Sequence, residues 1–332
     1  MIDGEIKELI HNAKSIGVVS HVRPDGDAIG SALGLGLALA NKGKQVQVVL
    51  RDGVSSTFRH LPGVDLVKKT FAEECDLYFS VDASDLQRTG GVLADRQPDI
   101  NIDHHITNTR FAKLNLVDDK AVATCEVLAI HLPSWGLEIT REVADNLLTG
   151  IVSDSIGFRT NNTTSRSLRT AADLMDVGSD ISELHNKALV SRSFEAANYW
   201  GFALGRLERE DRLVWTALTL ADRQISGYPA NDDADLTNIL SSIEDKDIAI
   251  LFVEQSASQT KVSWRSRQGV DVSKIALEMG GGGHPAAAGA DLTGTFDEIK
   301  LRVLNKTKQF LETLIDDPQN GVQANKNGAR NG

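Results

Sequence analysis

The first half of the chain alternates short runs of β-branched residues with longer segments in which apolar residues recur three and four positions apart. The β-branched runs predict strands at 17–22, 44–51, 76–84 and 99–105. The helical spacing predicts helices at 28–41, 122–135, 141–157 and 165–176. Because strands that alternate with helices build parallel sheets, we expect an α/β domain here: a doubly wound, mainly parallel sheet with helices on both faces.

The hydrophobic pattern changes after residue 180. Residues 181–210 keep a helical spacing throughout, which is typical of a connecting segment. The pattern then predicts strands at 213–220, 247–255 and 260–268, and helices at 234–243, 273–279 and 296–315. These elements predict a second, smaller α/β domain. The residues after it offer almost nothing to bury and are expected to form a disordered tail.

The length of the chain agrees with two domains, and its apolar stretches and first residues argue against a membrane-spanning or secreted protein. At roughly 100 to 200 residues per domain, 332 residues favour two compact units. The longest apolar stretch, 28–40, is interrupted by glycines and is shorter than the ~20 residues that cross a bilayer. The first residues carry no basic region of a secretory signal, so a cytoplasmic protein without membrane contact is expected. The expected boundaries are 1–185, a helical connector at 186–210, 211–315 and the tail at 316–332.

Charge and cysteine content exclude further classes. The net charge of −11 argues against a surface that grips long nucleic acid, so any contact with phosphate must be local. The two cysteines, Cys75 and Cys125, have no CxxC spacing and lie in apolar patterns. They are interpreted as reduced core residues.

Candidate chemistry gathers just past the carboxyl ends of the predicted strands, where open α/β sheets bind their ligands. The residues there are potential metal ligands: His21, Asp25, Asp27, Asp82, Asp103, His104 and His105. Any one of these aspartates alone is as readily a helix cap or a turn residue. Together they would bury several carboxylates, which is unfavourable by several kcal/mol per unpaired charge unless cations are present. Asp154 interrupts an apolar helix face and is either a further ligand or a polar residue facing water.

The spacing favours two metal ions. Asp25 and Asp27 flank Gly26, so a tight turn there can direct the two carboxylates to neighbouring ions. Two divalent ions about 3.5 to 4 Å apart are the usual clamp for phosphoryl hydrolysis. Mixed imidazole and carboxylate donors without thiolate suit Mn²⁺ and tolerate zinc, cobalt or iron.

A second candidate site lies in the stretch GGGGHPAAAGA, residues 280–290. Glycines allow backbone N–H groups to approach an anion, and a histidine beside them adds a donor. The alternative is a glycine-rich turn with a packed histidine. Upstream, strand alternation in TKVSWRSRQ puts basic residues on one face, which are either a solvated surface or a phosphate receptor. The candidate substrate-binding residues are Arg265, Ser266, Arg267, Gly281, Gly282, Gly283 and His284.

The motifs HVRPDGDAIGS, VDASD, IDHH and the Asp154 segment, in this order, resemble those of the DHH phosphoesterase family. The glycine run resembles the signature of the family's associated C-terminal domain, and the resemblance covers roughly residues 5 to 315. It implies a phosphohydrolase with two Mn²⁺ ions and an active-site cleft between its DHH domain and the second domain. It also implies roles for the site residues: His21, Asp25 and Asp82 on one ion; Asp27, Asp82, His104 and Asp154 on the other; Asp103 as a partner that orients its neighbours; His105 facing the scissile phosphate.

Within this family, a short two-domain chain is similar to the nanoRNase branch, also called bifunctional oligoribonuclease and pAp phosphatase. This implies manganese-dependent hydrolysis of very short oligoribonucleotides, including linear dinucleotides such as pApA and pGpG. A 3′-phosphatase activity on pAp, the direction of attack and a homodimeric state stay open. The alternatives are a catalytically silent nucleotide-binding sensor and an activity like that of the single-strand DNA exonucleases, which carry an added OB domain for which this chain has no room.

Overall fold

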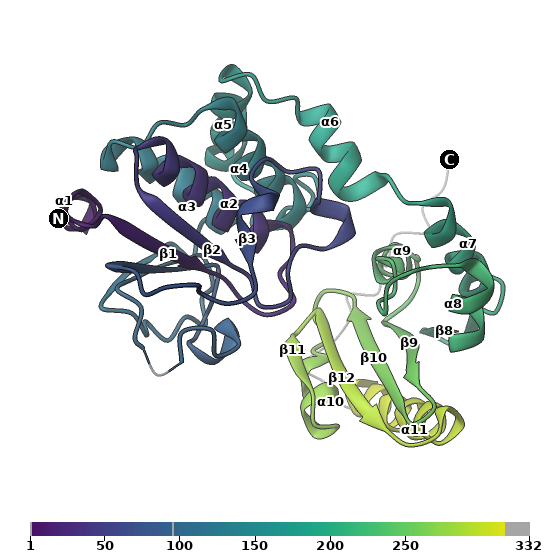
Figure 1. Cartoon of the computed structure of the whole chain (residues 1–332). Coiled ribbons are helices and arrows are strands. Elements are labelled where there is room, and N and C mark those ends of the chain that lie inside the picture. Colours follow the sequence, from purple (N-terminus) through teal and green to yellow (C-terminus); the bar gives the residue numbers. More distant parts are fainter. Residues whose placement is uncertain (1, 95, 316–332) are drawn as a thin grey trace, which may run out of the picture. The chain divides into compact units, whose positions relative to one another are not determined.

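The computed structural model describes residues 2–94 and 96–315, which fold as two compact units (Figure 1). The first unit ends at Ser191 and the second begins at Arg192. The tail predicted at 316–332 lies outside the described residues. Within the described part of the chain, no helix is both long enough and apolar enough to cross a membrane.

The first unit is built on a six-stranded sheet in which every neighbouring pair is parallel, in the order β3-β2-β1-β4-β5-β6. Its strands are β1 (Ser15–Val19), β2 (Gln45–Val49), β3 (Val67–Lys68), β4 (Leu77–Val81), β5 (Ile100–Asp103) and β6 (Leu114–Val117). The sheet confirms the predicted α/β class. The pattern missed β3 and β6, because both are short edge strands with only partial burial.

Helices lie on one side of this sheet. The helices of the first unit are α1 (Ile2–Asn12), α2 (Gly26–Asn41), α3 (Thr124–His131), α4 (Arg141–Asp154), α5 (Ser165–Asp176) and α6 (Ile181–His185). Helices α2 and α3 pack against the strands, α4 packs against these two helices, and α5 and α6 pack against α4. Side chains alternate along each strand, so Ile16 and Val18 of β1 face the helices and join the main core with Leu33 of α2 and Leu147 of α4. In Figure 1, α2, α3 and α4 lie together over this face.

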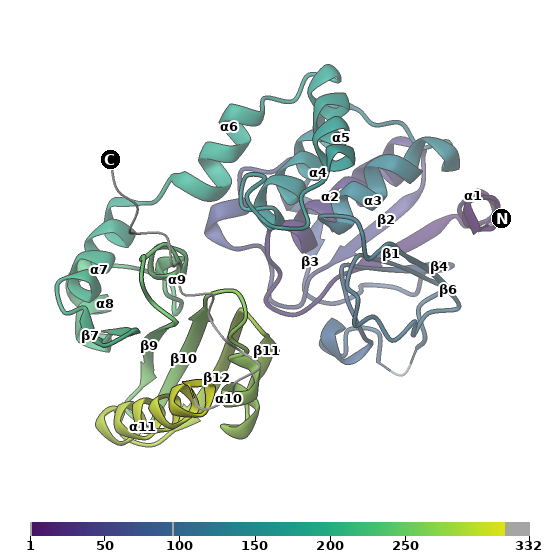
Figure 2. The same ribbon diagram turned by 180° about the vertical axis from the view of Figure 1, so that it is seen from behind.

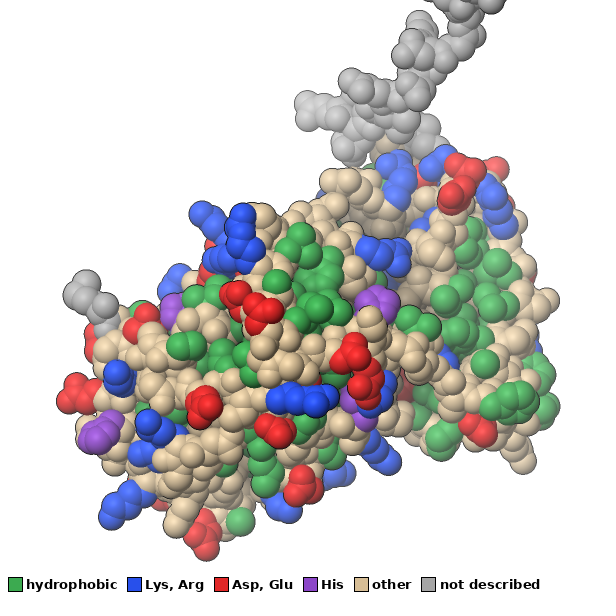
Figure 3. All heavy atoms as spheres, turned by 90° about the horizontal axis from the view of Figure 1, so that it is seen from above, with side chains coloured by type: hydrophobic (Ala, Val, Ile, Leu, Met, Phe, Trp, Pro, Cys, Tyr) green, Lys and Arg blue, Asp and Glu red, His purple; other side chains and the backbone are tan. Residues whose placement is uncertain are grey.

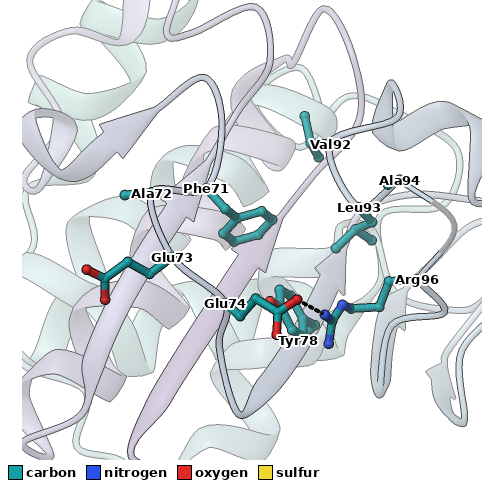
Figure 4. A pocket seen from close by; sticks show the side chains of 9 residues that line it. All are labelled: Phe71, Ala72, Glu73, Glu74, Tyr78, Val92, Leu93, Ala94 and Arg96. Carbon is teal, nitrogen blue, oxygen red and sulfur yellow. Dashed lines mark hydrogen bonds and ion pairs between the residues drawn. The ribbon is translucent and has the colours of Figure 1, made fainter.

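Loops cover the other face, where the prediction of helices on both faces is wrong. Val19, Val49 and Tyr78 point to this side, and the apolar residues packed on them, including Phe71 and Leu93, come from loops. Figure 4 shows these loop side chains around Tyr78 with the Glu74–Arg96 ion pair beside it, 2.9 Å between Oε1 and NH2. The rest of the face carries small or polar side chains such as Ser80 and Asn101. Such a face offers little apolar area for a helix.

The second unit contains a mixed sheet in the order β11-β12-β10-β9-β8-β7, parallel only between β8 and β9. Its strands are β7 (Glu208–Glu210), β8 (Leu213–Leu218), β9 (Ile248–Ser256), β10 (Gln259–Ser266), β11 (Gly282–His284) and β12 (Ala287–Thr293). Its helices are α7 (Phe194–Leu204), α8 (Leu220–Ser226), α9 (Leu236–Ser241), α10 (Ser273–Glu278) and α11 (Phe296–Ile315). Helices α10 and α11 cover one face, as Figure 2 shows, with Val262 and Trp264 packed beneath them.

The spacing predicted a helical connector between the two sheets, but this segment is not one continuous helix. Helix α6 continues into a π-helical turn, η5 (Asn186–Val190), and Ser191–Ser193 break the helix before α7 begins. The Ser193 hydroxyl accepts a hydrogen bond from the N–H of Ala196 (3.1 Å) and so starts α7 as a new helix. The apolar spacing continues across the break and therefore hides it in the sequence.

Close packing of α2 against α4 predicts a large effect of one added methyl group. A Cβ built on Gly30 of α2 would lie 2.5 Å from the carbonyl oxygen of Asn146 in α4, so Gly30→Ala must push the helices apart. We expect its free energy of unfolding to fall by about 1 to 3 kcal/mol. Gly4→Ala in α1 is the control, because its Cβ would meet nothing within 4 Å, and it should stabilise by about 0.5 to 1 kcal/mol. Urea unfolding measures both, and equal effects would contradict the packing argument.

Candidate metal centre and active site

The carboxyl edge of the parallel sheet gathers the predicted ligands. His21 follows β1, and Asp82 follows β4. Asp103 is the last residue of β5 and is followed by His104 and His105, and Asp154 is the last residue of α4. Among the described residues, three groups have ligand atoms within 4.8 Å of one another. The groups are His21, Asp25 and Asp82; Asp27, His104 and Asp154; and Asp82, His104 and His105.

Asp25 caps helix α2 and still has one carboxylate oxygen that could bind a metal ion. Its Oδ1 accepts the N–H groups of Asp27 (3.1 Å) and Ala28 (3.0 Å), which starts α2. Its Oδ2 lies 3.8 Å from Nε2 of His21, and that nitrogen is 3.5 Å from Oδ2 of Asp82. These three groups can therefore share one ion while α2 stays capped.

Asp82 lies between the two sets of ligands. Its Oδ2 faces His21, whereas its Oδ1 lies 3.8 Å from Nε2 of His104. The same His104 nitrogen is 3.8 Å from Oδ2 of Asp27 and 3.7 Å from Oδ2 of Asp154. Asp82 also has a φ of 54°, a left-handed conformation that is unfavourable for a residue with a side chain and that is common at functional sites. This geometry suits a carboxylate that bridges two ions.

Asp103 and His105 form a separate pair beside the ligands. Asp103 is fully buried, and its Oδ1 lies 2.8 Å from Nδ1 of His105. Its Oδ2 accepts a hydrogen bond from Nδ2 of Asn108 (2.6 Å). With Asp103 fixed on both oxygens, His105 is oriented with Nε2 away from the carboxylate, and this ring is more exposed than that of His104.

Two features of the site escaped the sequence analysis. Asn108, which fixes Asp103, comes after the predicted strand and resembles an ordinary turn residue. The N–H groups of Thr124 and Cys125 donate to the two oxygens of Asp27, at 2.7 and 2.9 Å. Nothing in the sequence links Asp27 to a helix start that lies nearly a hundred residues away, since that contact depends on how α2 and α3 pack.

The pKa values of these groups are shifted because several carboxylates and imidazoles lie buried beside one another. Burial works against charge on His21 and His104, but the surrounding aspartates outweigh it and raise the pKa of each histidine to about 9. Burial, together with the charges of Asp25 and Asp82, raises the pKa of Asp154 to about 7. Burial and the charge of Asp82 also raise the pKa of Asp27 well above its usual value, despite its two N–H donors. An Asp at the end of a helix, as in α4, is disfavoured further by the helix dipole.

These residues fit divalent cations. The donors are imidazole nitrogens and carboxylate oxygens, which together suit divalent transition metals. The nearby Cys125 is no competing thiolate, because burial raises the pKa of its thiol well above the usual value. Divalent ions would offset the repulsion between carboxylates that, together with burial, raises the pKa of Asp27 and of Asp154.

The predicted substrate-binding residues of the second unit differ in the groups that they contact. The guanidinium of Arg265 is half-buried and donates to the carbonyl of Trp264 (3.0 Å), and burial lowers its pKa. Among the described residues no carboxylate forms an ion pair with it. Arg267 instead binds Asp247, 2.5 Å from Nε to Oδ1. The Ser266 hydroxyl lies 2.6 Å from the carbonyl oxygen of Val270 and therefore holds the following turn.

The glycine run forms a β-hairpin rather than a loop of free amides. Residues Gly282–His284 form the edge strand β11, which pairs with β12. A Cβ on Gly281 would lie 2.1 Å from the carbonyl oxygen of Gly289, so this glycine is needed for close approach of the two backbones. Its N–H donates to the carbonyl of Ala276 (2.7 Å) and ends α10. The outer edge of β11 is exposed together with His284.

The pKa values predict that metal binding strengthens as the pH rises. A divalent ion must displace the protons on Asp154, with a pKa of about 7, and on His21 and His104, with pKa values of about 9. Affinity for Mn²⁺ should therefore increase with pH until these groups have titrated. Calorimetric titration in buffers with different ionisation enthalpies measures the released protons. His104→Ala should release fewer, and an affinity that does not change with pH would contradict this assignment.

Comparison with known proteins covers both units. A model of the DHH family, N-terminal domain, matches residues 15–151, and a DHHA1 domain model matches residues 223–316. A protein of Thermus thermophilus named bifunctional oligoribonuclease and PAP phosphatase NrnA is 33% identical over 308 residues, 89% of each chain. A protein of the same name from Mycoplasma genitalium is 31% identical, over 88% of this chain and 94% of that one.

A solved structure supports the same relationship. An exopolyphosphatase-related protein from Bacteroides fragilis has a TM-score of 0.85 and 25% identity, and the match covers 94% of this chain and 96% of that one. The order of the ligand motifs, the sheet that presents them and the two domain matches agree. The chain belongs to the DHH family of phosphoesterases, in the branch of the bifunctional oligoribonucleases and PAP phosphatases.

Proposed function

We propose that this enzyme hydrolyses phosphodiester bonds in very short oligoribonucleotides, including linear dinucleotides such as pApA and pGpG, with two Mn²⁺ ions as cofactor. The observation that carries the proposal is Asp82, whose two oxygens face two separate sets of ligands. The relatives at 31 and 33% identity are named for activity on oligoribonucleotides and on PAP, which supports the substrate class.

The donors favour manganese among the divalent ions. His21, Asp25 and Asp82 would hold one ion, and Asp27, Asp82, His104 and Asp154 the other. Magnesium prefers oxygen ligands alone, whereas Mn²⁺ accepts imidazole together with carboxylate. When bound, the two ions would supply Lewis-acid stabilisation of charge on the phosphate and lower the pKa of a bound water.

His105 is the residue proposed to act as the general acid of the reaction. Asp103 accepts a hydrogen bond from its Nδ1, and although burial opposes charge on the ring, Asp103 and Asp82 raise its pKa. A protonated His105 can stabilise the charge that develops on the phosphate, or donate the proton to the leaving oxygen from Nε2. Asn108 keeps the Asp103 carboxylate in place, because its Nδ2 donates a hydrogen bond to the oxygen of Asp103 that does not contact His105.

Arg265 is proposed to bind a substrate phosphate that is not cleaved. It is half-buried, and among the described residues no carboxylate forms an ion pair with it, so an anion would offset the desolvation that lowers its pKa. Arginine is also suited to bidentate contact with phosphate. Arg267, Ser266 and the glycines fit a supporting role, because their polar groups already hold Asp247, the turn at Val270 and the hairpin.

A set of free arginines supports an anionic substrate. Each of the four loops that carry ligands also carries one exposed arginine whose side chain makes no hydrogen bond or ion pair with the described residues. These are Arg23, Arg88, Arg110 and Arg159. Two of these loops are tied together, since the N–H of Val22 donates to the carbonyl of Arg88 (2.8 Å). Elsewhere basic and acidic side chains are interspersed, as on the face drawn in Figure 3, so the four arginines fit a local contact with a short polyanion.

A 3′-phosphatase activity on pAp is the second candidate for the same site, because both named relatives are described as bifunctional. A catalytically silent sensor is disfavoured, since it needs a broken ligand set and this set is complete. Substrate preference then separates a nanoRNase from an exonuclease that degrades long single-stranded DNA.

The proposed function predicts a strong dependence on substrate length and on His105. With Mn²⁺, the protein should cleave labelled pApA and pAp far faster than a 24-nucleotide RNA or DNA. His105→Ala should lower kcat by roughly 10² to 10⁴-fold because it removes the acid. His11→Ala, at an exposed site in α1, is the control and should leave kcat unchanged. Equal rates on all lengths would refute the preference for very short substrates. No turnover with any divalent metal would refute the proposed phosphodiesterase activity.

The arginine set predicts a change in salt dependence. Replacing Arg88 and Arg110 with alanine should weaken binding of pApA and flatten the fall of kcat/KM with salt, by about 0.7 in log–log slope per lost phosphate contact. Arg169→Ala, on α5 and bonded to Ser165, should leave the slope unchanged. The measurement is kcat/KM over a series of salt concentrations. If the slope of the double variant equals that of the wild type, the arginines do not contact the substrate.

A further inference from the structure

We propose that Thr124 is a positioning residue, which fixes the carboxylates of Asp27 and Asp82 in the orientation that two ions require. Thr124 is fully buried at the start of α3. It lies outside the ligand set, and no proposed step of the reaction touches it. The inference rests on the proposed two-ion centre and not on the identity of the substrate.

One residue contacts both sets of ligands. The N–H of Thr124 donates to Oδ2 of Asp27 (2.7 Å), and its hydroxyl donates to Oδ1 of Asp82 (2.9 Å). Asp27 belongs to one set, whereas Asp82 faces both. These contacts join residues separated by 97 and 42 positions in the chain, so they exist only because α2, α3 and the end of β4 meet.

The hydroxyl determines how Asp82 can turn. A carboxylate oxygen has two lone pairs, and the bond from Thr124 uses one on Oδ1. Rotation of the carboxylate would break this bond and leave a buried oxygen without its donor, which is unfavourable. Oδ1 therefore stays toward His104 while Oδ2 stays toward His21, at 3.8 and 3.5 Å. The bridging orientation exists before any ion binds.

The start of α3 is itself held rigidly. The N–H of Cys125 donates to Oδ1 of Asp27 (2.9 Å), and the buried Glu126 accepts the N–H of Val122 (2.7 Å). Arg166 of α5 donates to the other oxygen of Glu126 (2.9 Å) and forms an ion pair with Asp118 (2.8 Å). The residues on both sides of Thr124 in the chain are thus held by hydrogen bonds of their own, which a positioning role requires.

A purely structural role makes a different prediction. If the hydroxyl only satisfied a buried carboxylate, its loss would lower the stability of the metal-free protein and leave metal affinity unchanged. A positioning role changes the affinity, because partners of metal ligands typically alter it by about 10 to 100-fold when they are lost. Mn²⁺ affinity separates the two roles without any measurement of catalysis.

The test compares Thr124→Val, which keeps the shape and the N–H but loses the hydroxyl, with Thr124→Ser, which keeps the hydroxyl. Calorimetric titration of the full chain with Mn²⁺ should show binding weakened by roughly 10 to 100-fold in Thr124→Val and near wild type in Thr124→Ser. Thr149→Val is the matched control, since Thr149 is also fully buried but its hydroxyl donates to the backbone of Asp145 (2.7 Å). Wild-type affinity in Thr124→Val would overturn the proposal.

If Thr124→Val does not fold, Arg166→Gln provides a second test of the proposal. Its position is partly exposed, and the change loosens the start of α3 through Glu126, so a several-fold loss of Mn²⁺ affinity is expected. Wild-type affinity there would overturn the anchoring on which the proposal depends. A wild-type protein that binds two Mn²⁺ ions but cleaves no nucleotide would refute the proposed function alone. A folded wild type that binds no Mn²⁺ would refute the two-ion centre together with the role of Thr124.

Discussion

The charge balance at the carboxyl edge of the parallel sheet is the constraint on which the rest of the first unit depends. Asp27 and Asp82 are almost fully buried, close to one another and to Asp154. This crowding of charged groups shifts their pKa values: those of His21 and His104 rise to about 9, and that of Asp154 rises to about 7. Shifts of this kind, which arise from burial together with specific charged neighbours, cluster at functional sites.

The surrounding structure holds this cluster in place in several ways. Asp82 adopts a left-handed backbone conformation, which the paired strands β4 and β5 maintain, since its N–H still donates to the carbonyl of Ile102 (3.0 Å). Gly30 allows α2 to approach α4 closely, so that Asp27 and Asp154 reach the same group of ligands. Hydrogen-bond donors outside the cluster fix its carboxylates: Asn108 donates to Asp103, and the N–H of Thr124 at the start of α3 donates to Asp27.

The second unit illustrates how tertiary contacts separate residues that look equivalent in the sequence. Arg265 and Arg267 are two positions apart, which places them on the same face by strand alternation. Strand β10 ends at Ser266, however, and Arg267 lies beyond it in an ion pair with Asp247. Arg265 stays on the strand and forms no ion pair with a carboxylate of the described residues. Gly281 and Gly283 serve the close approach of β12, because a Cβ on either would lie 2.1 or 2.5 Å from its backbone.

The sequence by itself determined the class of fold and the ligand candidates. Strands buried on both faces are continuous β-branched runs, and a polar residue at the end of such a run must lie at the sheet edge. Only the tertiary structure decided that loops cover the second face, that a break separates α6 from α7, and that Thr124 and Asn108 support the ligands. The physical reason is that periodicity reports which side of an element is buried, whereas a hydrogen bond between distant residues depends on how whole helices pack.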